Sequence, residues 1–226
     1  CFIKNIPFKF YNDNLTGIKF YFGHNEVKEI EFIKKNSTHK SVFIDIGANL
    51  GLYTQNIAFL NNKNRKITII AIEPNPINCS RLKENIMLLK YKIKNLNNLI
   101  KIKKCAVGNV NKKKILNFSN GLANGYISNN KKNKFSISVD CKKLYDIVKD
   151  ENLSYITNLK IDIEGYEDRA LIPFFQKAKK TLFPKNILLE HSGKQFWEKD
   201  LIKFLMKIGY KKIFKNKSNL ALTLKR

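Results

Sequence analysis

The hydrophobic residues of the chain follow two alternating patterns along its first half. Continuous apolar runs rich in β-branched residues occupy residues 42–46 and 66–72, as expected for parallel strands covered on both faces. Apolar residues at helical spacing follow each run, over residues 52–60 and 77–89. This order predicts a parallel βαβ unit.

The second half of the chain continues the alternation with shorter elements. The pattern predicts further strands at residues 99–108, 114–118, 135–139, 157–163 and 186–190, and a closing pair at 210–214 and 220–224. It also predicts helices over residues 140–148, with Asp140 as the N-terminal cap, and 196–208.

Two segments lie outside this alternation. Residues 1–25 contain two short β-like runs, 6–11 and 17–22, which predict an N-terminal hairpin. Residues 119–134 are rich in glycine, asparagine and lysine and separate two predicted strands. A loop of this length inside a compact domain is usually functional or disordered, so an active-site lid and a disordered surface insertion are equally open.

The first predicted strand runs directly into a glycine turn with a carboxylate at its mouth. Asp45 interrupts the apolar run, and Gly47 and Gly51 allow a tight turn and a close backbone approach to a ligand. A dinucleotide site would require G-x-G-x-x-G, whereas Asn49 stands at the middle position here. A carboxylate attracts the sulfonium and ammonium groups of S-adenosylmethionine but repels a pyrophosphate. The turn therefore favours S-adenosylmethionine.

Two later strand ends supply groups for the same cofactor. Glu73 ends the second strand, where a carboxylate can accept hydrogen bonds from two ribose hydroxyls, and Pro74 prevents further strand pairing. Cys105, Ala106 and Val107 end the third strand, where small residues would form a flat apolar wall for adenine. An ordinary strand end explains each of these three side chains equally well.

Three motifs occur in order along the chain and resemble those of one enzyme family. They are Asp45-Ile-Gly-Ala-Asn-Leu-Gly51, Glu73-Pro-Asn-Pro76 and Leu159-Lys-Ile-Asp-Ile-Glu-Gly165. Over residues 26–192 the sequence is similar to FkbM-type methyltransferases. The resemblance implies a Rossmann-like α/β fold of class I methyltransferase type. Its mostly parallel seven-stranded sheet carries helices on both faces and an antiparallel edge strand. The resemblance also implies S-adenosylmethionine as donor and a hydroxyl of a saccharide or secondary metabolite as acceptor.

The strand ends and the resemblance together define a cofactor site. The residues expected to contact the cofactor are Asp45, Gly47, Ala48, Asn49, Gly51, Tyr53, Glu73, Pro74, Cys105, Ala106, Val107 and Asp162. Tyr53 and Tyr126 are candidates for stacking on adenine or a sugar ring.

Catalytic groups are expected at the ends of the fourth and fifth strands, because ligands bind at the carboxyl ends of parallel strands. One of Asp162 and Glu164 would contact the methionine amino group, and the other would face the acceptor. Asp162 is also a candidate ligand of a divalent cation. Transfer to a hydroxyl needs in-line geometry and a nearby base. His191 is the first candidate, since its ordinary pKa of about 6.5 suits the task, with Asp162 and Glu164 as alternatives. His24 is a weaker candidate for the border of the acceptor cleft.

The net charge of +25 would ordinarily suggest a nucleic acid or an anionic surface as partner. Only Arg65, Arg81, Arg169 and Arg226 among the 43 basic residues are arginines, whereas recognition of phosphate and guanine favours arginine. We therefore interpret the lysine excess as compositional and expect a small-molecule or glycan acceptor. A weak attraction to acidic glycans or membrane headgroups stays open.

Two other functions are alternatives to O-methyl transfer. A nucleic-acid (RNA) methyltransferase would be expected to carry [DNS]-P-P-[YFW] at the fourth strand or a Pro-Cys nucleophile, and the sequence has neither. A degenerate, non-catalytic binding module would be expected to have lost Asp45, Glu73 or Asp162, and all three are present. An NAD-dependent oxidoreductase fits least well because of Asn49.

Length and cysteine content set the remaining bounds. A chain of 226 residues with 43% hydrophobic residues fits one domain over residues 1–226. Its four cysteines form no C-x-x-C pair, which argues against a disulfide framework or a zinc site and fits a reducing cytoplasm. No window approaches the roughly 18 uninterrupted apolar residues of a spanning helix, so a soluble, cytoplasmic protein is expected.

Overall fold

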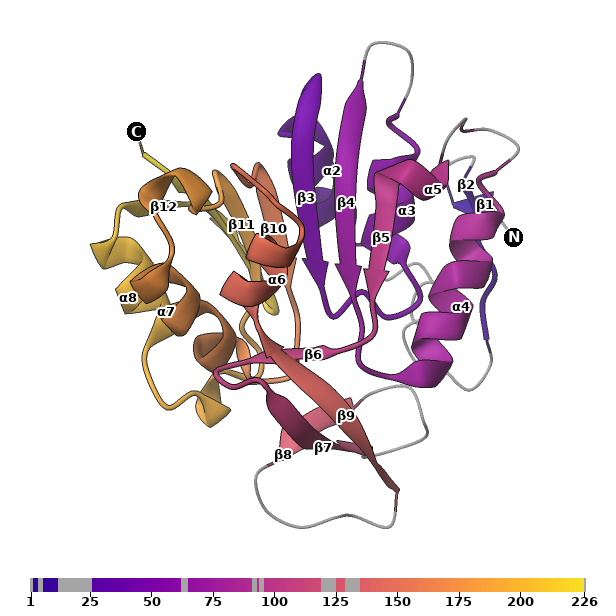
Figure 1. Cartoon of the computed structure of the whole chain (residues 1–226). Coiled ribbons are helices and arrows are strands. Elements are labelled where there is room, and N and C mark those ends of the chain that lie inside the picture. The colour runs from indigo at the N-terminus through magenta and orange to yellow at the C-terminus, as the bar shows by residue number, and fades with distance from the viewer. Residues whose placement is uncertain are drawn as a thin grey trace.

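The computed structural model of the protein describes residues 2–3, 6–11, 26–61, 65–90, 93, 96–118, 125–128 and 135–225. Its centre is a seven-stranded sheet (Figure 1). In spatial order the strands are β12 (Tyr210–Lys215), β13 (Asn219–Leu224), β11 (Asn186–Glu190), β10 (Asn158–Ile161), β3 (Lys40–Ile46), β4 (Lys66–Ile72) and β5 (Ile100–Lys103). The five strands from β11 to β5 pair in parallel.

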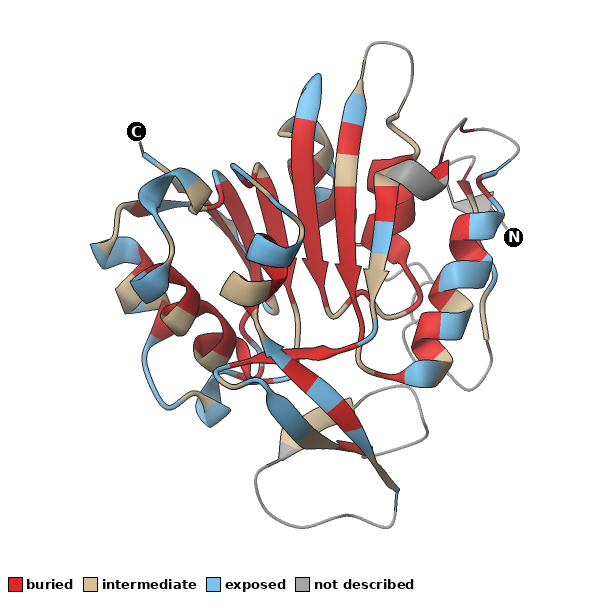
Figure 2. Ribbon diagram, viewed as in Figure 1, coloured by how far each residue is buried: buried red, intermediate tan, exposed pale blue. Residues whose placement is uncertain are grey.

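Helices cover both faces of this sheet, which explains the continuous apolar strands. One layer contains α2 (Val27–Lys35), α3 (Leu52–Ala58), α4 (Pro76–Met87) and α5 (Leu96–Leu99), and the other contains α6 (Leu144–Asp150), α7 (Glu167–Lys177) and α8 (Leu201–Lys207). In β3, Ile44 and Ile46 pack into the core beneath α6, α7 and α8, whereas Phe43 packs toward α2, α3 and α4. Figure 2 shows the resulting buried strands between helices with exposed outer surfaces.

A second sheet lies beyond the carboxyl ends of β3, β4 and β5 (Figure 1). Its spatial order is β6 (Ala106–Gly108), β9 (Ser136–Lys143), β7 (Lys112–Phe118) and β8 (Gly125–Ser128). It has a small core of its own that includes Ala106, Leu116 and Cys141. This sheet therefore covers the end of the main sheet at which ligands of α/β folds bind.

The described N-terminal residues form a short hairpin that is not the expected one, and the expected pairing of residues 6–11 with 17–22 stays a prediction. The strand β1 (Phe2–Ile3) pairs antiparallel with β2 (Ile6–Pro7), and the expected partner run at 17–22 lies outside the described residues. Ile6 and Phe8 are buried in the core beside α3, so this segment is anchored to the domain.

The α/β prediction is confirmed, and two details of the predicted strands need correction. The antiparallel strand of the main sheet is β13, which lies between β11 and the true edge strand β12. The predicted strand over residues 99–108 is divided into β5 and β6, which belong to different sheets. Ala106 and Val107 are buried here because the chain leaves the main sheet to pair with β9.

The helices also differ from the predicted bounds. Asp140 lies within β9 and does not cap a helix, since α6 begins after Lys143. The last helix begins later than expected because the Asp200 carboxylate accepts a hydrogen bond from the Lys203 N–H and caps it there; residues 194–196 form a separate 3₁₀ turn. Helix α7 was not predicted at all. No helix among the described residues is both long enough and apolar enough to cross a bilayer.

The turn after β3 should tolerate no side chain at its first glycine. Gly47 has φ +77°, and a Cβ there would lie 1.9 Å from the Asp162 carbonyl oxygen. We expect Gly47→Ala to lower the free energy of unfolding by about 3 kcal/mol or more, because backbone strain and a backbone collision add. Gly209 is the matched control, since it has φ +106° but its Cβ would be 3.6 Å from the nearest atom.

Urea denaturation measures how much each variant, Gly47→Ala and Gly209→Ala, lowers the free energy of unfolding. Gly209→Ala should cost only about 1–2 kcal/mol, the strain of a left-handed alanine alone. Equal losses in the two variants would show that the contact between the turn and the end of β10 is not tight.

Candidate functional site

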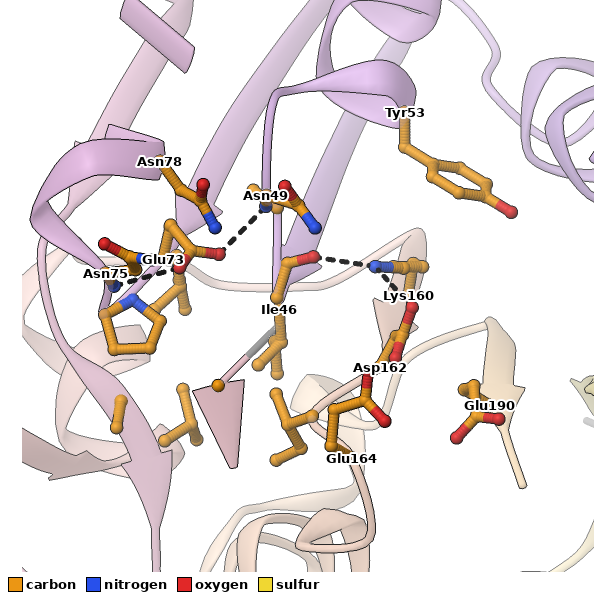
Figure 3. Close-up of a pocket in the computed structure, with 18 of the residues that line it drawn as sticks. Ile46, Asn49, Tyr53, Glu73, Asn75, Asn78, Lys160, Asp162, Glu164 and Glu190 are labelled. Carbon is orange, nitrogen blue, oxygen red and sulfur yellow. Dashed lines mark hydrogen bonds and ion pairs between the residues drawn. The ribbon is translucent and has the colours of Figure 1, made fainter. Parts of the chain in front are cut away.

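A pocket of about 270 Å³ lies at the carboxyl ends of the parallel strands. Its walls come from the turn after β3, the first turn of α3, the segment after β4, residues 105–107, the loop after β10 and the end of β11. Gly125 and Ile127 of β8 complete it from the second sheet. Figure 3 shows the polar side chains that face one another across this space.

The glycine turn positions one wall of the pocket. The backbone N–H groups of Gly47 and Ala48 both donate to the Ile72 carbonyl at the end of β4, at 2.9 and 3.0 Å. Gly47, Ala48 and Asn49 therefore line the pocket as predicted. Gly51 does not line it. Gly51 has φ +92°, and a Cβ there would lie 2.4 Å from Leu82 Cδ1, so its role is close packing of α3 against α4.

Glu73 is held rigidly at the pocket wall. Its Oε2 accepts a hydrogen bond from the Asn49 N–H and its Oε1 accepts one from the Asn75 N–H, each at 2.9 Å. Burial raises the pKa of Glu73 to about 7, although these two backbone donors oppose the rise. The Asn78 side chain also hydrogen-bonds this carboxylate. Each carboxylate oxygen has two lone-pair positions, so a ligand that displaces the Asn78 amide finds one open position on each oxygen. Pro74 lines the pocket beside it.

Lys160 is the central cation of the site, and the sequence interpretation missed it. Its Nζ donates to the Gly47 carbonyl at 2.8 Å and lies 3.7 Å from Asp45 Oδ1 and 3.6 Å from Asp162 Oδ2. Burial alone would lower the pKa of Lys160, but the carboxylates of Asp162 and Asp45 outweigh it and raise the pKa. The ammonium group therefore stays charged and joins the turn after β3 to the end of β10 (Figure 3).

Asp45 lies beneath the pocket and is not part of its wall. The side chain is fully buried, and its Oδ2 accepts a hydrogen bond from Thr54 Oγ1 at 2.7 Å. Burial raises the pKa of Asp45, and Lys160 opposes that shift. Asp45 thus faces Lys160 rather than the pocket, although it was expected to contact a cofactor directly. A charge inside an apolar strand drew attention to Asp45, and the same signal was available at Lys160.

Asp162 and Glu164 both line the pocket from the turn that follows β10. The strand β10 ends at Ile161, and Glu164 and Gly165 have φ values of +55° and +89°. The chain therefore turns sharply after Asp162. The buried Glu167 holds this turn, because its Oε1 accepts hydrogen bonds from the N–H groups at positions 163 and 165.

Glu167 is in turn fixed by the segment before α8. Its Oε2 accepts a hydrogen bond from Trp197 Nε1 at 2.7 Å. Burial raises the pKa of Glu167 to about 7. Trp197 therefore has a structural role here.

His191 is not placed on the pocket wall. It is 5% exposed, and its backbone N–H donates to the Ser218 carbonyl. Its Nε2 is buried and makes no hydrogen bond to the described residues. The neighbouring Glu190 lines the pocket instead. The geometry thus favours Glu190 over His191 as a group that faces a ligand.

Four more of the residues expected to contact a cofactor lie on the pocket wall. Cys105, Ala106 and Val107 line the pocket, and so does Tyr53, whose hydroxyl donates a short hydrogen bond to Glu26. The pocket residues that the sequence interpretation missed are Lys160, Glu26, Asn75, Asn78, Ser192 and Asn219. Asn75 and Ser192 were not found because single polar residues next to helix and strand ends carry no periodic signal, whereas Lys160 lies inside the apolar run of β10, where its charge was a usable signal.

Several other predictions fall partly or wholly outside the described residues. His24 lies outside them, as do residues 119–124 and 129–134 of the expected lid. Between these, residues 125–128 form β8, but Tyr126 is not on the pocket wall. Cys79, Cys105 and Cys141 are buried free thiols. Within the part of the chain that is described, no three His, Cys, Asp or Glu side chains are grouped to hold a metal ion.

Three solved structures with a similar fold carry the names of methyltransferases or methylases. A methyltransferase FkbM from Methylobacillus flagellatus KT matches with a TM-score of 0.56 at 17% identity, over 82% of this chain and 43% of that one. A putative rRNA-methylase from Clostridium thermocellum matches with a TM-score of 0.52 at 10% identity, over 88% and 95% of the two chains. The METTL16 methyltransferase domain matches with a TM-score of 0.51 at 17% identity, over 88% and 65%. The fold is thus that of class I methyltransferases.

The family follows from the sequence itself. Residues 45–212 match the profile of the methyltransferase FkbM domain, which is well over half of the chain. The chain therefore belongs to the FkbM methyltransferase family. It spans less than half the length of the Methylobacillus flagellatus protein. No curated protein matches it.

Loss of the Lys160 charge should destabilise the protein in a pH-dependent way. Lys160→Met leaves the buried Asp45 carboxylate without its cation, which should cost about 3–5 kcal/mol of unfolding free energy at pH 8. Because the pKa of Asp45 would rise further in this variant, the carboxyl group becomes protonated and neutral as the pH falls. The loss should therefore shrink between pH 8 and pH 5.

Chemical denaturation at the two pH values tests this effect. Lys142→Met is the control, because Lys142 pairs at 3.8 Å with Asp150 and both side chains are exposed; its cost should be about 0–1 kcal/mol. A Lys160→Met cost no larger than that of Lys142→Met would contradict the assigned role.

Proposed function

We propose that this chain is an S-adenosylmethionine-dependent O-methyltransferase that methylates a hydroxyl group of a saccharide or secondary metabolite. The observation that carries the proposal is the fixed, buried carboxylate of Glu73 on the pocket wall, in a chain of the FkbM methyltransferase family. A carboxylate at the end of the second parallel strand is the group that binds ribose hydroxyls in related nucleotide sites.

The residues of the pocket fit this cofactor. Once a ligand displaces the Asn78 amide, Glu73 has one lone pair on each oxygen for two ribose hydroxyls. Residues 105–107 offer a small apolar surface for adenine. Asp162 lies next to the Gly47 turn and can accept a hydrogen bond from the methionine ammonium. When bound, S-adenosylmethionine supplies an electrophilic methyl group. The protein's part is to align an acceptor with it and exclude water.

The acceptor would bind on the side of the pocket formed by the β10 and β11 loops. Asp162, Glu164 and Glu190 all line that side, and each carboxylate can take up a hydroxyl proton if it lies within hydrogen-bonding reach. His191 stays a candidate only through a rearrangement that brings its buried ring to the wall. The basic surface is the one feature that favours the alternative, an RNA methyltransferase.

Removal of the Glu73 charge should weaken cofactor binding. Glu73→Gln keeps the shape of the side chain but loses two charge-assisted hydrogen bonds to ribose, so S-adenosylhomocysteine should bind about 10–100-fold more weakly. Calorimetric titration measures this. Glu84→Gln, an exposed residue that pairs with Lys9, should bind as the wild type does. Wild-type affinity in Glu73→Gln would remove Glu73 from the cofactor site.

The raised pKa of Glu73 predicts a pH dependence of the same affinity. Ribose hydroxyls donate to the ionised carboxylate, so protonation competes with binding below the pKa of about 7. The dissociation constant for S-adenosylhomocysteine should therefore increase about tenfold from pH 8 to pH 6. The Glu73→Gln variant should lack this dependence. A wild-type affinity that is constant over the range would contradict the protonation of Glu73.

A further inference from the structure

The pocket wall has the opposite charge balance from the rest of the chain. Basic residues outnumber acidic residues 43 to 18 in the sequence. Among the described residues that line the pocket, however, Lys160 is the single basic residue, and five are acidic: Glu26, Glu73, Asp162, Glu164 and Glu190. A chain with this composition would by chance place several lysines there. The acidic wall is therefore a property of the site itself.

The pocket cation is already engaged and cannot serve an anionic ligand. Lys160 lies between Asp45 and Asp162 and donates to the Gly47 carbonyl. Glu73 belongs to the proposed ribose site, and Glu26 accepts the hydrogen bond of the Tyr53 hydroxyl. A phosphate or uronate placed here would meet carboxylates without a free partner, which is unfavourable at short range.

Contacts within the described part of the protein satisfy only one oxygen of the Glu190 carboxylate. Its Oε1 accepts hydrogen bonds from the backbone N–H and the hydroxyl of Ser192. Its Oε2 is buried and has no hydrogen-bond partner among the described residues, and the residue is 8% exposed. A buried carboxylate oxygen without a donor is costly. Such an oxygen on a pocket wall indicates that a ligand provides the missing donor.

The position of Glu190 separates it from the proposed ribose site. Figure 3 shows Glu190 and Glu73 on opposite sides of the pocket, with Asp162 between them. Burial raises the pKa of Glu190, Ser192 opposes this shift, and the charge of Asp162 adds to it. A cation beside Glu190 would oppose this rise and favour the ionised carboxylate.

We propose that Glu190 and Asp162 form an acceptor subsite for a protonated amine, and that the acceptor is an aminated polyol such as an amino sugar. This inference rests on the proposed function. S-adenosylmethionine has two cationic groups and one carboxylate, a net charge of about +1, which does not balance the acids of the wall. The ammonium group of the acceptor donates to Glu190 Oε2 and places a neighbouring hydroxyl toward the methyl group. A neutral polyol leaves the excess charge of the wall unbalanced.

Matched sugar pairs test the inference with the full chain saturated with S-adenosylhomocysteine. Ligand-observed NMR titrations compare glucosamine with glucose, galactosamine with galactose and mannosamine with mannose, at neutral pH. At least one amino sugar should bind about tenfold or more tightly than its neutral partner, the effect of one charge-assisted hydrogen bond. Glucuronate should bind more weakly than glucose.

Three variants assign the preference to Glu190. Glu190→Gln should abolish the preference for the amine, and Glu190→Asp, which keeps the charge, should retain part of it. Glu31→Gln, an exposed residue that pairs with Lys34, should bind as the wild type does. All of these variants should keep the wild-type affinity for S-adenosylhomocysteine, which also shows that they fold.

The possible failures are distinguishable. Failure of the wild type to bind S-adenosylhomocysteine would overturn the proposed function. Normal cofactor binding without an amine preference in any pair, or with no sugar bound at all, would overturn only the acceptor assignment. A Glu190→Gln variant with weakened cofactor binding would place Glu190 in the cofactor site and overturn the assignment as well.

Discussion

The ion-pair cluster around Lys160 determines how the two halves of the sheet meet at the ligand-binding edge. Lys160 is on β10, but its ammonium group donates to the Gly47 carbonyl in the turn after β3 and lies near Asp45 and Asp162. The turn and the strand end also touch directly, because Gly47 packs against the Asp162 carbonyl. Burying the charges of Lys160 and Asp45 is costly unless each one is compensated, so the cluster favours this arrangement of the turn and the strand end. Glu73 takes its position from the same turn, through the Asn49 N–H.

Sequence patterns predicted the α/β fold and the glycine turn because both depend on local signals. The parallel strands are continuous apolar runs, and Glu73 is the acid that ends one of them, so the side chain and its strand end could be identified together. The catalytic side was harder to predict. His191 was favoured for its ordinary pKa, but the adjacent Glu190 lines the pocket instead. Composition does not tell which of two neighbouring residues at the end of β11 faces the pocket. Likewise, the division of residues 99–108 depends on pairing of β6 with the distant β9, which no local pattern encodes.

The distribution of charge connects the fold to the proposed chemistry. Lysines dominate the sequence, yet the pocket wall is acidic apart from Lys160. The net charge alone would suggest a nucleic-acid-binding protein. The acidic pocket instead agrees with the proposed cationic cofactor and with an acceptor rich in hydrogen-bond donors. The FkbM family assignment and the class I fold agree with methyl transfer, and under our proposal a few side chains on the β10 and β11 loops select the acceptor. Function in this fold thus depends on the loops rather than on the sheet that carries them.

A crystal structure of the full chain with S-adenosylhomocysteine tests the central claim most directly. The account predicts that both ribose hydroxyls lie within hydrogen-bonding distance of the Glu73 carboxylate, with the adenine against residues 105–107 and Glu190 Oε2 still free of the cofactor. A ribose bound away from Glu73, or a cofactor bound outside this pocket, would contradict it.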